Sequence, residues 1–376
     1  MRPLNTIYRY VLFGVMFLLT GCTTASTIID THVHMNVSAT TTADCSGAYA
    51  ALIPLVTGYM DQYNIKKSII MSQPLNSFVL DSPPFCKHYK YMGPSLEPYH
   101  DRFLFLGGGA SLNPMLKRYA DPTTVTPAIR GQFKATAYEI LEAGAIGFGE
   151  ITTEHFSLVS GGHHYQSVAA DHPLMLSLAD IAAYRNVPID LHMEALPLGR
   201  IPLPKWLQRL NDNPAVATIN PSHLYKNIDK LENLLRHNRE ARIVWVHAAW
   251  DNSSYRLVGV MKRLLDEHPN LYMSIKQRSR PPYNQSQPQH FNTPQGHPGL
   301  RTFNRVLDHN DRLKNIWLKL FKEFPNRFMI GQDQHFPNNY EIEAMDRMNA
   351  LLSQLPSGLR DKIAGLNALR IYNLSN

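Results

Sequence analysis

Short apolar runs of strand length alternate with longer amphipathic stretches along most of this chain. The runs are rich in β-branched and aromatic residues, which favours strands. The stretches between them have the spacing of helices with one buried face, as two examples show: Ile228, Leu231, Leu234 and Leu235 in one, and Leu257, Val260, Met261, Leu264 and Leu265 in the other. We expect eight strands, near residues 28–33, 67–72, 102–107, 145–150, 187–192, 242–247, 270–275 and 327–332.

Strands that alternate with helices predict a parallel sheet, and eight is the number that closes into a barrel. The phrase Pro-Asn occurs twice between a predicted helix and a strand, at 269–270 and 325–326, where proline ends the helix. An open, doubly wound sheet is the competing architecture, but no glycine-rich phosphate loop follows the first strand. We therefore predict an α/β fold, a (β/α)8 TIM barrel.

No linker or change of composition divides the chain after residue 27, so we expect residues 28–376 to form a single domain. Two long irregular loops are expected on the carboxyl-end face of the barrel. Residues 151–171 follow strand four and contain His155, His163 and His164, and residues 277–300 follow strand seven. Each loop is either an active-site lid or a surface insertion without a catalytic role.

The first 21 residues have the pattern of a signal peptide, with basic Arg2 and Arg9, an apolar run over 11–19 and a small-residue end at Cys22. The run is too short to span a bilayer comfortably. It resembles a bacterial lipoprotein signal, which implies lipidation of Cys22 and a short tether over 22–27. An ordinary secretory signal is the alternative. The predicted location is the bacterial cell envelope, lipid-anchored on the periplasmic side, with the barrel mouth facing away from the membrane.

Composition is that of a globular protein: 376 residues, of which 44% are hydrophobic. Loss of residues 1–21 removes two arginines and no carboxylates, so the net charge falls from +7 to +5. This modest charge is not clustered, which argues against a nucleic-acid partner. Cys45 and Cys86 fall in predicted loops at the same end of the fold, in a protein expected in an oxidising compartment. The sequence leaves two alternatives, a disulfide bond between them or two free thiols.

Side chains that can bind metals stand at the carboxyl ends of five predicted strands. In the first strand, alternation places His32 and His34 on one face, so two imidazoles can share an ion. In a barrel all carboxyl ends converge on one mouth, where the active site lies. Each of these residues closes an apolar strand, a poor place for an unpaired polar group. The candidate ligands are His32, His34, Glu150, His192, His247 and Asp333, although Glu150 and His247 could instead support ligands by hydrogen bonds.

This constellation resembles the amidohydrolase superfamily, and in particular its amidohydrolase-related (amidohydrolase 2) branch. The resemblance extends to Asp171-His172-Pro173-Leu174 and to the closing segment 365–372. It implies a barrel that holds one or two divalent ions, most often zinc, with Asp333 as the proton-transfer group and His247 as a ligand or a polarising group. Two departures are Glu150, where many two-metal members carry a carboxylated lysine, and Gly331-Gln332-Asp333, where Gly-Ser-Asp is more usual.

The residues predict a metal-dependent hydrolase that cleaves a C–O, C–N or P–O bond of a small soluble substrate, with Asp333 and His247 as catalytic residues. Lys276 and Arg278, just past strand seven, are either substrate-binding cations or solvated loop residues. One alternative is a non-oxidative decarboxylase of the same family, which a single ion would leave open. Another is a lipid-anchored binding protein without catalytic activity.

Overall fold

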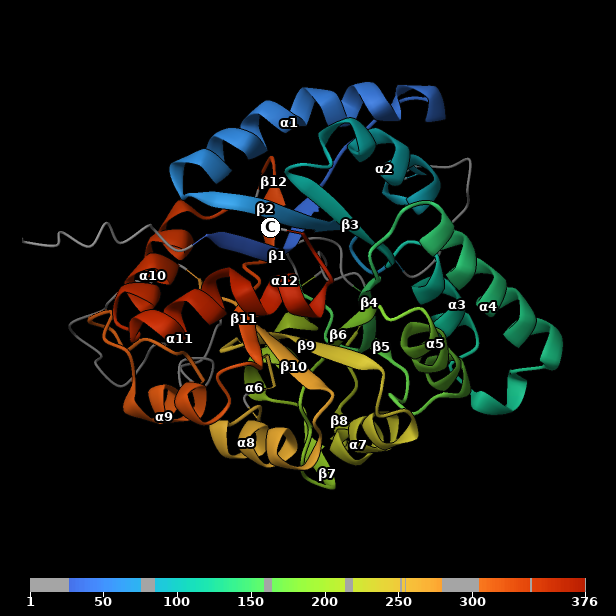
Figure 1. Ribbon diagram of the computed structural model, residues 1–376. Helices are drawn as coiled ribbons and strands as arrows, with labels where there is room; N and C mark the ends of the chain where they lie inside the picture. Colours follow the sequence, from blue (N-terminus) through green and yellow to red (C-terminus); the bar gives the residue numbers. More distant parts are fainter. Residues whose placement is uncertain are drawn as a thin grey trace, which may run out of the picture.

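The computed structural model describes residues 27–75, 85–158, 164–213, 219–250, 252–253, 255–278, 304–338 and 340–375. Its centre is a closed parallel barrel of eight strands (Figure 1). Closure is made by the pairing of the first and last strands, where Asp30 lies opposite Ile330. The predicted (β/α)8 barrel is confirmed, with strands β1 (Ile28–Met35), β2 (Ile65–Met71), β3 (Phe103–Gly108), β4 (Phe148–His155), β6 (Pro188–Met193), β9 (Arg242–Ala248), β10 (Leu271–Ile275) and β11 (Phe328–Ile330).

Helices surround the barrel as an outer ring in Figure 1. The longer ones are α1 (Cys45–Gln62), α2 (Tyr89–Leu96), α4 (Pro127–Glu142), α5 (Pro173–Tyr184), α7 (Ile228–His237), α8 (Val258–Glu267), α9 (Asn315–Glu323) and α10 (Ile342–Ser353). Shorter ones are α3 (Leu112–Arg118), α6 (Lys205–Leu210), α11 (Ser357–Asp361), α12 (Asn367–Ile371), the 3-10 turns η1 (Thr42–Asp44), η2 (Phe85–Lys87), η3 (Glu97–Tyr99) and η4 (Pro122–Thr124), and the π-turn η7 (Lys362–Leu366).

The predicted apolar stripe of α7 is buried in full. In α8, Met261, Leu264 and Leu265 are buried as predicted and Val260 is partly buried, but Leu257 is the N-cap residue and is 47% exposed. Within the described ranges, no helix combines the length and apolarity needed to cross a membrane. Residues 1–26, with the predicted signal peptide, Cys22 and nearly all of the tether, lie outside the described residues.

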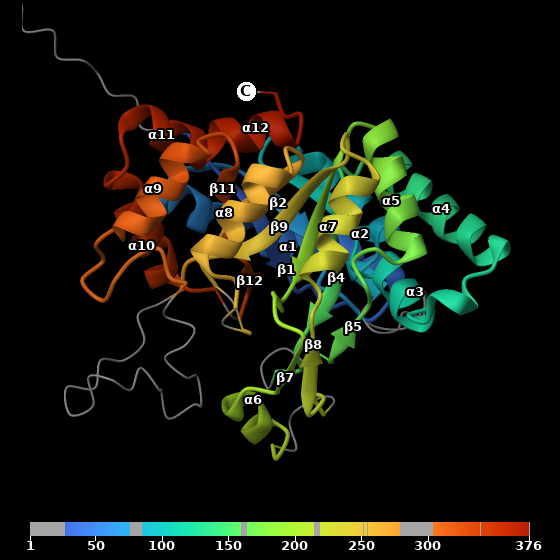
Figure 2. The ribbon, with the colours of Figure 1, turned by 90° about the horizontal axis from the view of Figure 1, so that it is seen from below.

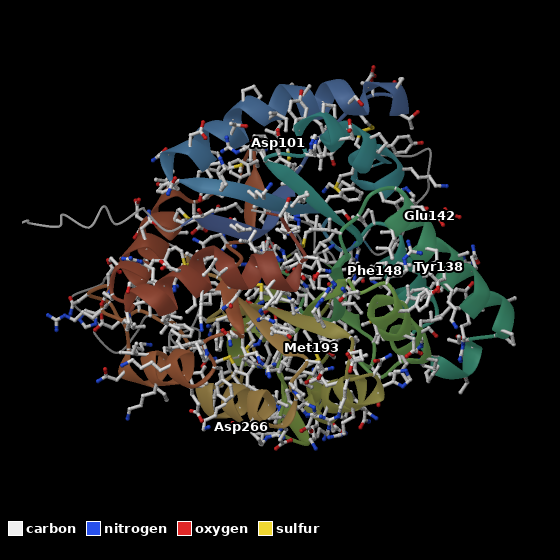
Figure 3. The ribbon with its side chains drawn as sticks, viewed as in Figure 1. Asp101, Tyr138, Glu142, Phe148, Met193 and Asp266 are labelled. Atoms are coloured by element: carbon white, nitrogen blue, oxygen red, sulfur yellow. A yellow bond between two sulfur atoms is a disulfide. The ribbon has the colours of Figure 1, made fainter. Side chains whose placement is uncertain are left out.

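The core has two layers because side chains alternate along each strand. On β9, Ile243 and Trp245 join the large cluster between the strands and the helices, whereas Val244 and Val246 join a smaller cluster inside the barrel. Tyr372, directly after α12, belongs to the inner cluster. Figure 2 shows α12 at the end of the barrel opposite β7, β8 and α6. In Figure 3, Phe148 and Met193 lie on barrel strands and belong to the large cluster under the helices, while Asp266 lies at the outer edge.

The loops differ from the prediction in two places. Residues 151–155 are not irregular, because β4 continues to His155 and pairs with the antiparallel β5 (Gln166–Ser167). The structure also contains an excursion between β6 and β9 that the sequence pattern did not indicate, with β7 (Arg200–Pro202), α6 and β8 (His223–Tyr225). His163 and residues 279–300 of the second predicted loop lie outside the described residues.

The two cysteines left open by the sequence form a disulfide bond. Cys45 and Cys86 have Cα atoms 5.4 Å apart. Neither lies in a loop as expected: Cys45 is the first residue of α1 and Cys86 belongs to the turn η2. The bond therefore ties the start of the first barrel helix to the segment that leads into the second.

Candidate metal centre

Two imidazoles of β1 face each other at the carboxyl end of the barrel. The Nε2 atoms of His32 and His34 are 3.1 Å apart, and both side chains are buried. Nδ1 of His34 lies 2.9 Å from the carbonyl oxygen of Met71. A carbonyl only accepts hydrogen bonds, so Nδ1 carries the proton and Nε2 presents a lone pair. Burial lowers the pKa of His32 to about 3, so the ring of His32 is neutral.

One carboxylate oxygen of Asp333, directly before β12 (Gln334–Phe336), and one of Glu150, on β4, meet these nitrogens. Oδ1 of Asp333 lies 3.1 Å from Nε2 of His34 and 3.6 Å from Nε2 of His32. Oε2 of Glu150 lies 3.6 Å and 3.8 Å from the same two nitrogens. We call these four atoms, two nitrogens and two oxygens, the four-donor set.

The separations within the four-donor set resemble those of a tetrahedral ion site, and three of its residues, His32, His34 and Asp333, form a candidate metal group. Bonds of about 2.0–2.1 Å to a central ion place ligand atoms about 3.3 Å apart at the corners of a tetrahedron. Five of its six separations are given above and lie between 3.1 and 3.8 Å. Lone-pair donors that converge in a buried place repel one another, and a cation between them would remove that repulsion. The residues present therefore fit a divalent ion, and a set of imidazoles and carboxylates suits zinc or manganese.

The other two predicted histidines, His192 and His247, lie next to the second carboxylate oxygen of Glu150, Oε1. Nδ1 of His192 is 2.6 Å from Oε1 of Glu150, and Nε2 of His247 is 3.3 Å from the same oxygen. Burial alone would lower the pKa of His192, but the carboxylates of Glu150 and Glu194 outweigh it and raise the pKa to about 9. His192 thus pairs with Glu150 instead of facing the four-donor set, and its role as a ligand stays a prediction.

His247 stands between the two carboxylates. Its Nε2 is 4.0 Å from Oδ2 of Asp333, and it forms a candidate metal group with His32 and Glu150. Burial and the nearby ammonium of Lys276 hold its pKa well below the usual range, so the ring is neutral. A neutral imidazole here can bind an ion or a substrate oxygen.

Two residues of the candidate site have a strained backbone. Asp333 and His247 have φ values of 55° and 64°, in the left-handed region that side chains with a Cβ rarely adopt. Each such residue costs on the order of 1–3 kcal/mol, and the surrounding structure has to enforce it. For Asp333, the residue lies between β11 and β12 (Gln334–Phe336), and its amide donates to the carbonyl of His32. With this backbone, Nε2 of His247 and Oδ2 of Asp333 lie 4.0 Å apart in the site.

The two cations predicted after strand seven occupy different positions. Lys276 is 5% exposed, and its Nζ forms an ion pair with Oδ2 of Asp333. It is therefore not a solvated loop cation. Burial lowers the pKa of Lys276, whereas the pKa of Asp333, which burial would raise, is held well below its usual range first by Lys276 and then by His335. Arg278 lies further out, with Nη1 2.7 Å from Oε1 of Glu341.

The structure adds His335, which the sequence analysis did not single out. Its Nε2 is 2.9 Å from Oδ1 of Asp333, and its ring stacks on that of His34 at a centroid distance of 4.4 Å. On its other side, Nδ1 lies 2.9 Å from Nε2 of Gln73, whose amide donates. The spacing Asp333-x-His335 repeats that of His32-x-His34, which is the signal that could have identified it.

No protein-family model matches the sequence, and no curated protein matches it. Several solved structures are similar. A dihydroxybenzoic acid decarboxylase from Polaromonas sp. JS666, with bound manganese and the inhibitor 2-nitroresorcinol, is 14% identical with a TM-score of 0.52, over 94% of this chain and 98% of that one. A 2,6-dihydroxybenzoate decarboxylase is 14% identical (TM-score 0.48, 93% and 100% coverage). Amidohydrolase 2 from Bifidobacterium longum subsp. infantis is 11% identical (TM-score 0.43, 93% and 100%). At 14% identity the likeness concerns the fold, a (β/α)8 barrel similar to that of the Polaromonas enzyme.

Proposed function

We propose that this chain is a metal-dependent enzyme of the amidohydrolase superfamily, and that it hydrolyses a bond of a small soluble substrate. The observation that carries the proposal is the four-donor set, in which residues from three distant parts of the chain meet at the barrel mouth. Active sites of this fold lie at that mouth. Likeness to a manganese-containing barrel enzyme adds support for the family.

A divalent ion bound there would lower the pKa of a water molecule from about 15.7 toward 7 and polarise a substrate oxygen. Asp333 is placed to take a proton and later deliver it to a leaving group. His335 and Lys276 orient its two oxygens. Neutral His247, between the carboxylates, is placed to hold the substrate oxygen on which negative charge develops.

The runner-up is a non-oxidative decarboxylase. The solved structure with a TM-score of 0.52 is of a decarboxylase. In addition, Lys276 and His335 hold the pKa of Asp333 well below its usual range, although burial opposes this, and a carboxylate of low pKa is a weak base. A lyase makes less demand on Asp333 as a base, because decarboxylation does not require a water molecule to be deprotonated.

The test is a product assay on the zinc- or manganese-loaded full chain. Small esters, lactones, amides and phosphate esters are compared with hydroxybenzoates, and release of carbon dioxide separates a lyase from a hydrolase. Asp333→Asn should lower kcat by about three orders of magnitude or more, since it removes a proton-transfer group and an anionic ligand. Asp266→Asn, on the outer edge, is the matched control.

Absence of turnover with every substrate would contradict the proposed activity, and turnover retained by Asp333→Asn would contradict the role given to Asp333. A binding protein without catalytic activity would instead keep its ligand affinity in Asp333→Asn.

The signal-peptide pattern supports a second proposal, that Cys22 is lipidated and the protein is anchored in the bacterial cell envelope on the periplasmic side. Labelling with a fatty-acid probe should modify the wild type and leave Cys22→Ala unmodified. Recovery of unlabelled wild-type protein in the soluble periplasmic fraction would indicate an ordinary secretory signal.

A further inference from the structure

Each carboxylate of the centre divides its two oxygens between different partners. Oδ1 of Asp333 and Oε2 of Glu150 belong to the four-donor set. Oδ2 of Asp333 pairs with the ammonium of Lys276, and Oε1 of Glu150 accepts from Nδ1 of His192. The inner oxygens therefore face one shared point, whereas each outer oxygen already contacts a nitrogen of the chain.

The outer oxygens are where a second ion would find ligands. With Nε2 of His247, which lies 3.3 Å from Oε1 of Glu150 and 4.0 Å from Oδ2 of Asp333, they make a three-atom group beside the four-donor set. A cation placed there would contact Oδ2 of Asp333. The ammonium of Lys276 already makes that contact, so the two cations would compete for the same oxygen.

Lys276 is held at this position by the backbone on both sides of the contact. It directly follows β10, and its amide donates to the carbonyl of Ala248 at 3.0 Å. The next amide, that of Gln277, donates to Oε1 of Gln332 at 2.9 Å, one residue before Asp333. The side chain of Lys276 is 6% exposed, so the ammonium cannot move into solvent without opening the site.

From this geometry we propose that the centre binds a single divalent ion in the four-donor set, and that the ammonium of Lys276 takes the place of a second ion. The inference rests on the metal centre of the proposed function and adds the number of ions and a role for Lys276. Lys276 is then a positioning residue that neutralises Asp333, and not a group that binds substrate.

The test counts ions by titration of the metal-free full chain with Mn²⁺, followed by equilibrium dialysis and electron paramagnetic resonance. The wild type should bind one ion per chain in excess metal and give the spectrum of an isolated ion. Lys276→Met should bind a second ion and give the signal of a spin-coupled pair. Lys276→Arg, which keeps the charge, and Arg278→Met, which removes the neighbouring cation, should both remain at one ion.

Two ions in the wild type would overturn the inference regardless of any variant. A folded Lys276→Met or Lys276→Gln that still binds one ion, with the wild-type affinity, would overturn it as well. Thermal unfolding verifies that each variant is folded, and the glutamine variant is used if methionine is not tolerated. Absence of the metal centre on which the proposed function rests gives a different result, since no ion would then bind at all.

Discussion

Nδ1 of His192 lies 2.6 Å from Oε1 of Glu150, and both side chains are buried at the mouth of the barrel. The pKa of His192, which burial would lower, is raised to about 9 by Glu150 and Glu194. The metal-free protein therefore stores a proton between these residues at neutral pH. An ion on the other oxygen of Glu150 would weaken the hold of that carboxylate on the proton.

The first prediction follows from this pair. Binding of Zn²⁺ at pH 7 should release about one proton per ion from the wild type, because the ion lowers the pKa of His192. The measurement is calorimetry in two buffers of different ionisation enthalpy. His192→Asn should release none, whereas His237→Asn, which removes an exposed histidine that also pairs with an aspartate, should behave as the wild type. Equal release from His192→Asn would show that the proton comes from elsewhere.

His335 holds Asp333 in position, and replacement of His335 should lower the affinity for the metal ion. Nε2 of His335 fixes Oδ1 of Asp333 at 2.9 Å, and such supporting contacts are worth about 10–100-fold in affinity. We expect His335→Ala to weaken Zn²⁺ binding by that factor with little change in fold, as measured by competition with a chelator. His309→Ala, which removes an exposed histidine, is the control. Unchanged Zn²⁺ affinity in His335→Ala would show that His335 does not support the metal ligand Asp333.

Glu154 should make the protein less stable as pH rises. Burial raises its pKa from 4.5 to about 7, and outweighs the hydrogen bonds from Tyr165 and from Ser167, whose hydroxyl donates to Oε2 at 2.8 Å. Between these values the unfolded chain has lost the proton that the native state keeps. Ionisation therefore favours unfolding, and stability falls from pH 4.5 to 7 and levels off above it.

Glu154→Gln keeps the neutral form at every pH. We expect it to equal the wild type at pH 4.5 and to exceed it by about 2–3 kcal/mol at pH 8, as measured by denaturant unfolding. Glu139→Gln, at a more exposed carboxylate, should not reproduce this gain. A Glu154→Gln variant that is less stable than the wild type at pH 8 would indicate an ionised, paired Glu154.

The Cys45–Cys86 bond should contribute to stability. It spans a sequence separation of 41 residues, and closing a loop of that size removes entropy from the unfolded chain worth about 4 kcal/mol. We expect the double variant Cys45→Ser/Cys86→Ser to unfold at a lower denaturant concentration, and reductant to lower the stability of the wild type toward it. Reductant should not affect the double variant. No difference between reduced and oxidised wild type would contradict the prediction.

The hydroxyl group of Tyr372 should contribute to the free energy of unfolding. Its hydroxyl lies 2.7 and 2.9 Å from the two oxygens of Asp190, which is fully buried inside the barrel. Tyr372→Phe leaves that carboxyl group without this donor, at a cost of about 1–3 kcal/mol in unfolding free energy. Tyr184→Phe is the control, because Tyr184 is 80% exposed. Equal stabilities of the two variants would show that water replaces the lost donor.

Much of the fold could be predicted because the signals were local. Alternating apolar runs located all eight barrel strands, and the pattern at Ile228 to Leu235 located a helix face. Spacing alone also brought His32 and His34 together, since period two is a property of any strand. The ends of the other strands followed from barrel topology, which is why Glu150 and Asp333 could be placed near them.

What could not be predicted depends on distances between remote segments. Nothing in the sequence near Lys276 indicates that its ammonium meets Asp333, 57 positions later. The excursion with β7 and β8 was missed because its strands have three residues each, too few to show a period. Pairing of Cys45 with Cys86 likewise depended on a Cα separation that only coordinates supply.

The C-terminal segment gives the barrel a floor. The α12 helix lies across the end opposite the mouth, and Tyr372 reaches inward to Asp190 on β6. At Gly365, just before α12, an added Cβ would come within 2.4 Å of the carbonyl oxygen of Thr27, so the two pieces of backbone touch. The barrel is therefore closed at this end, so any molecule that reaches the candidate metal centre must enter and leave over the same rim.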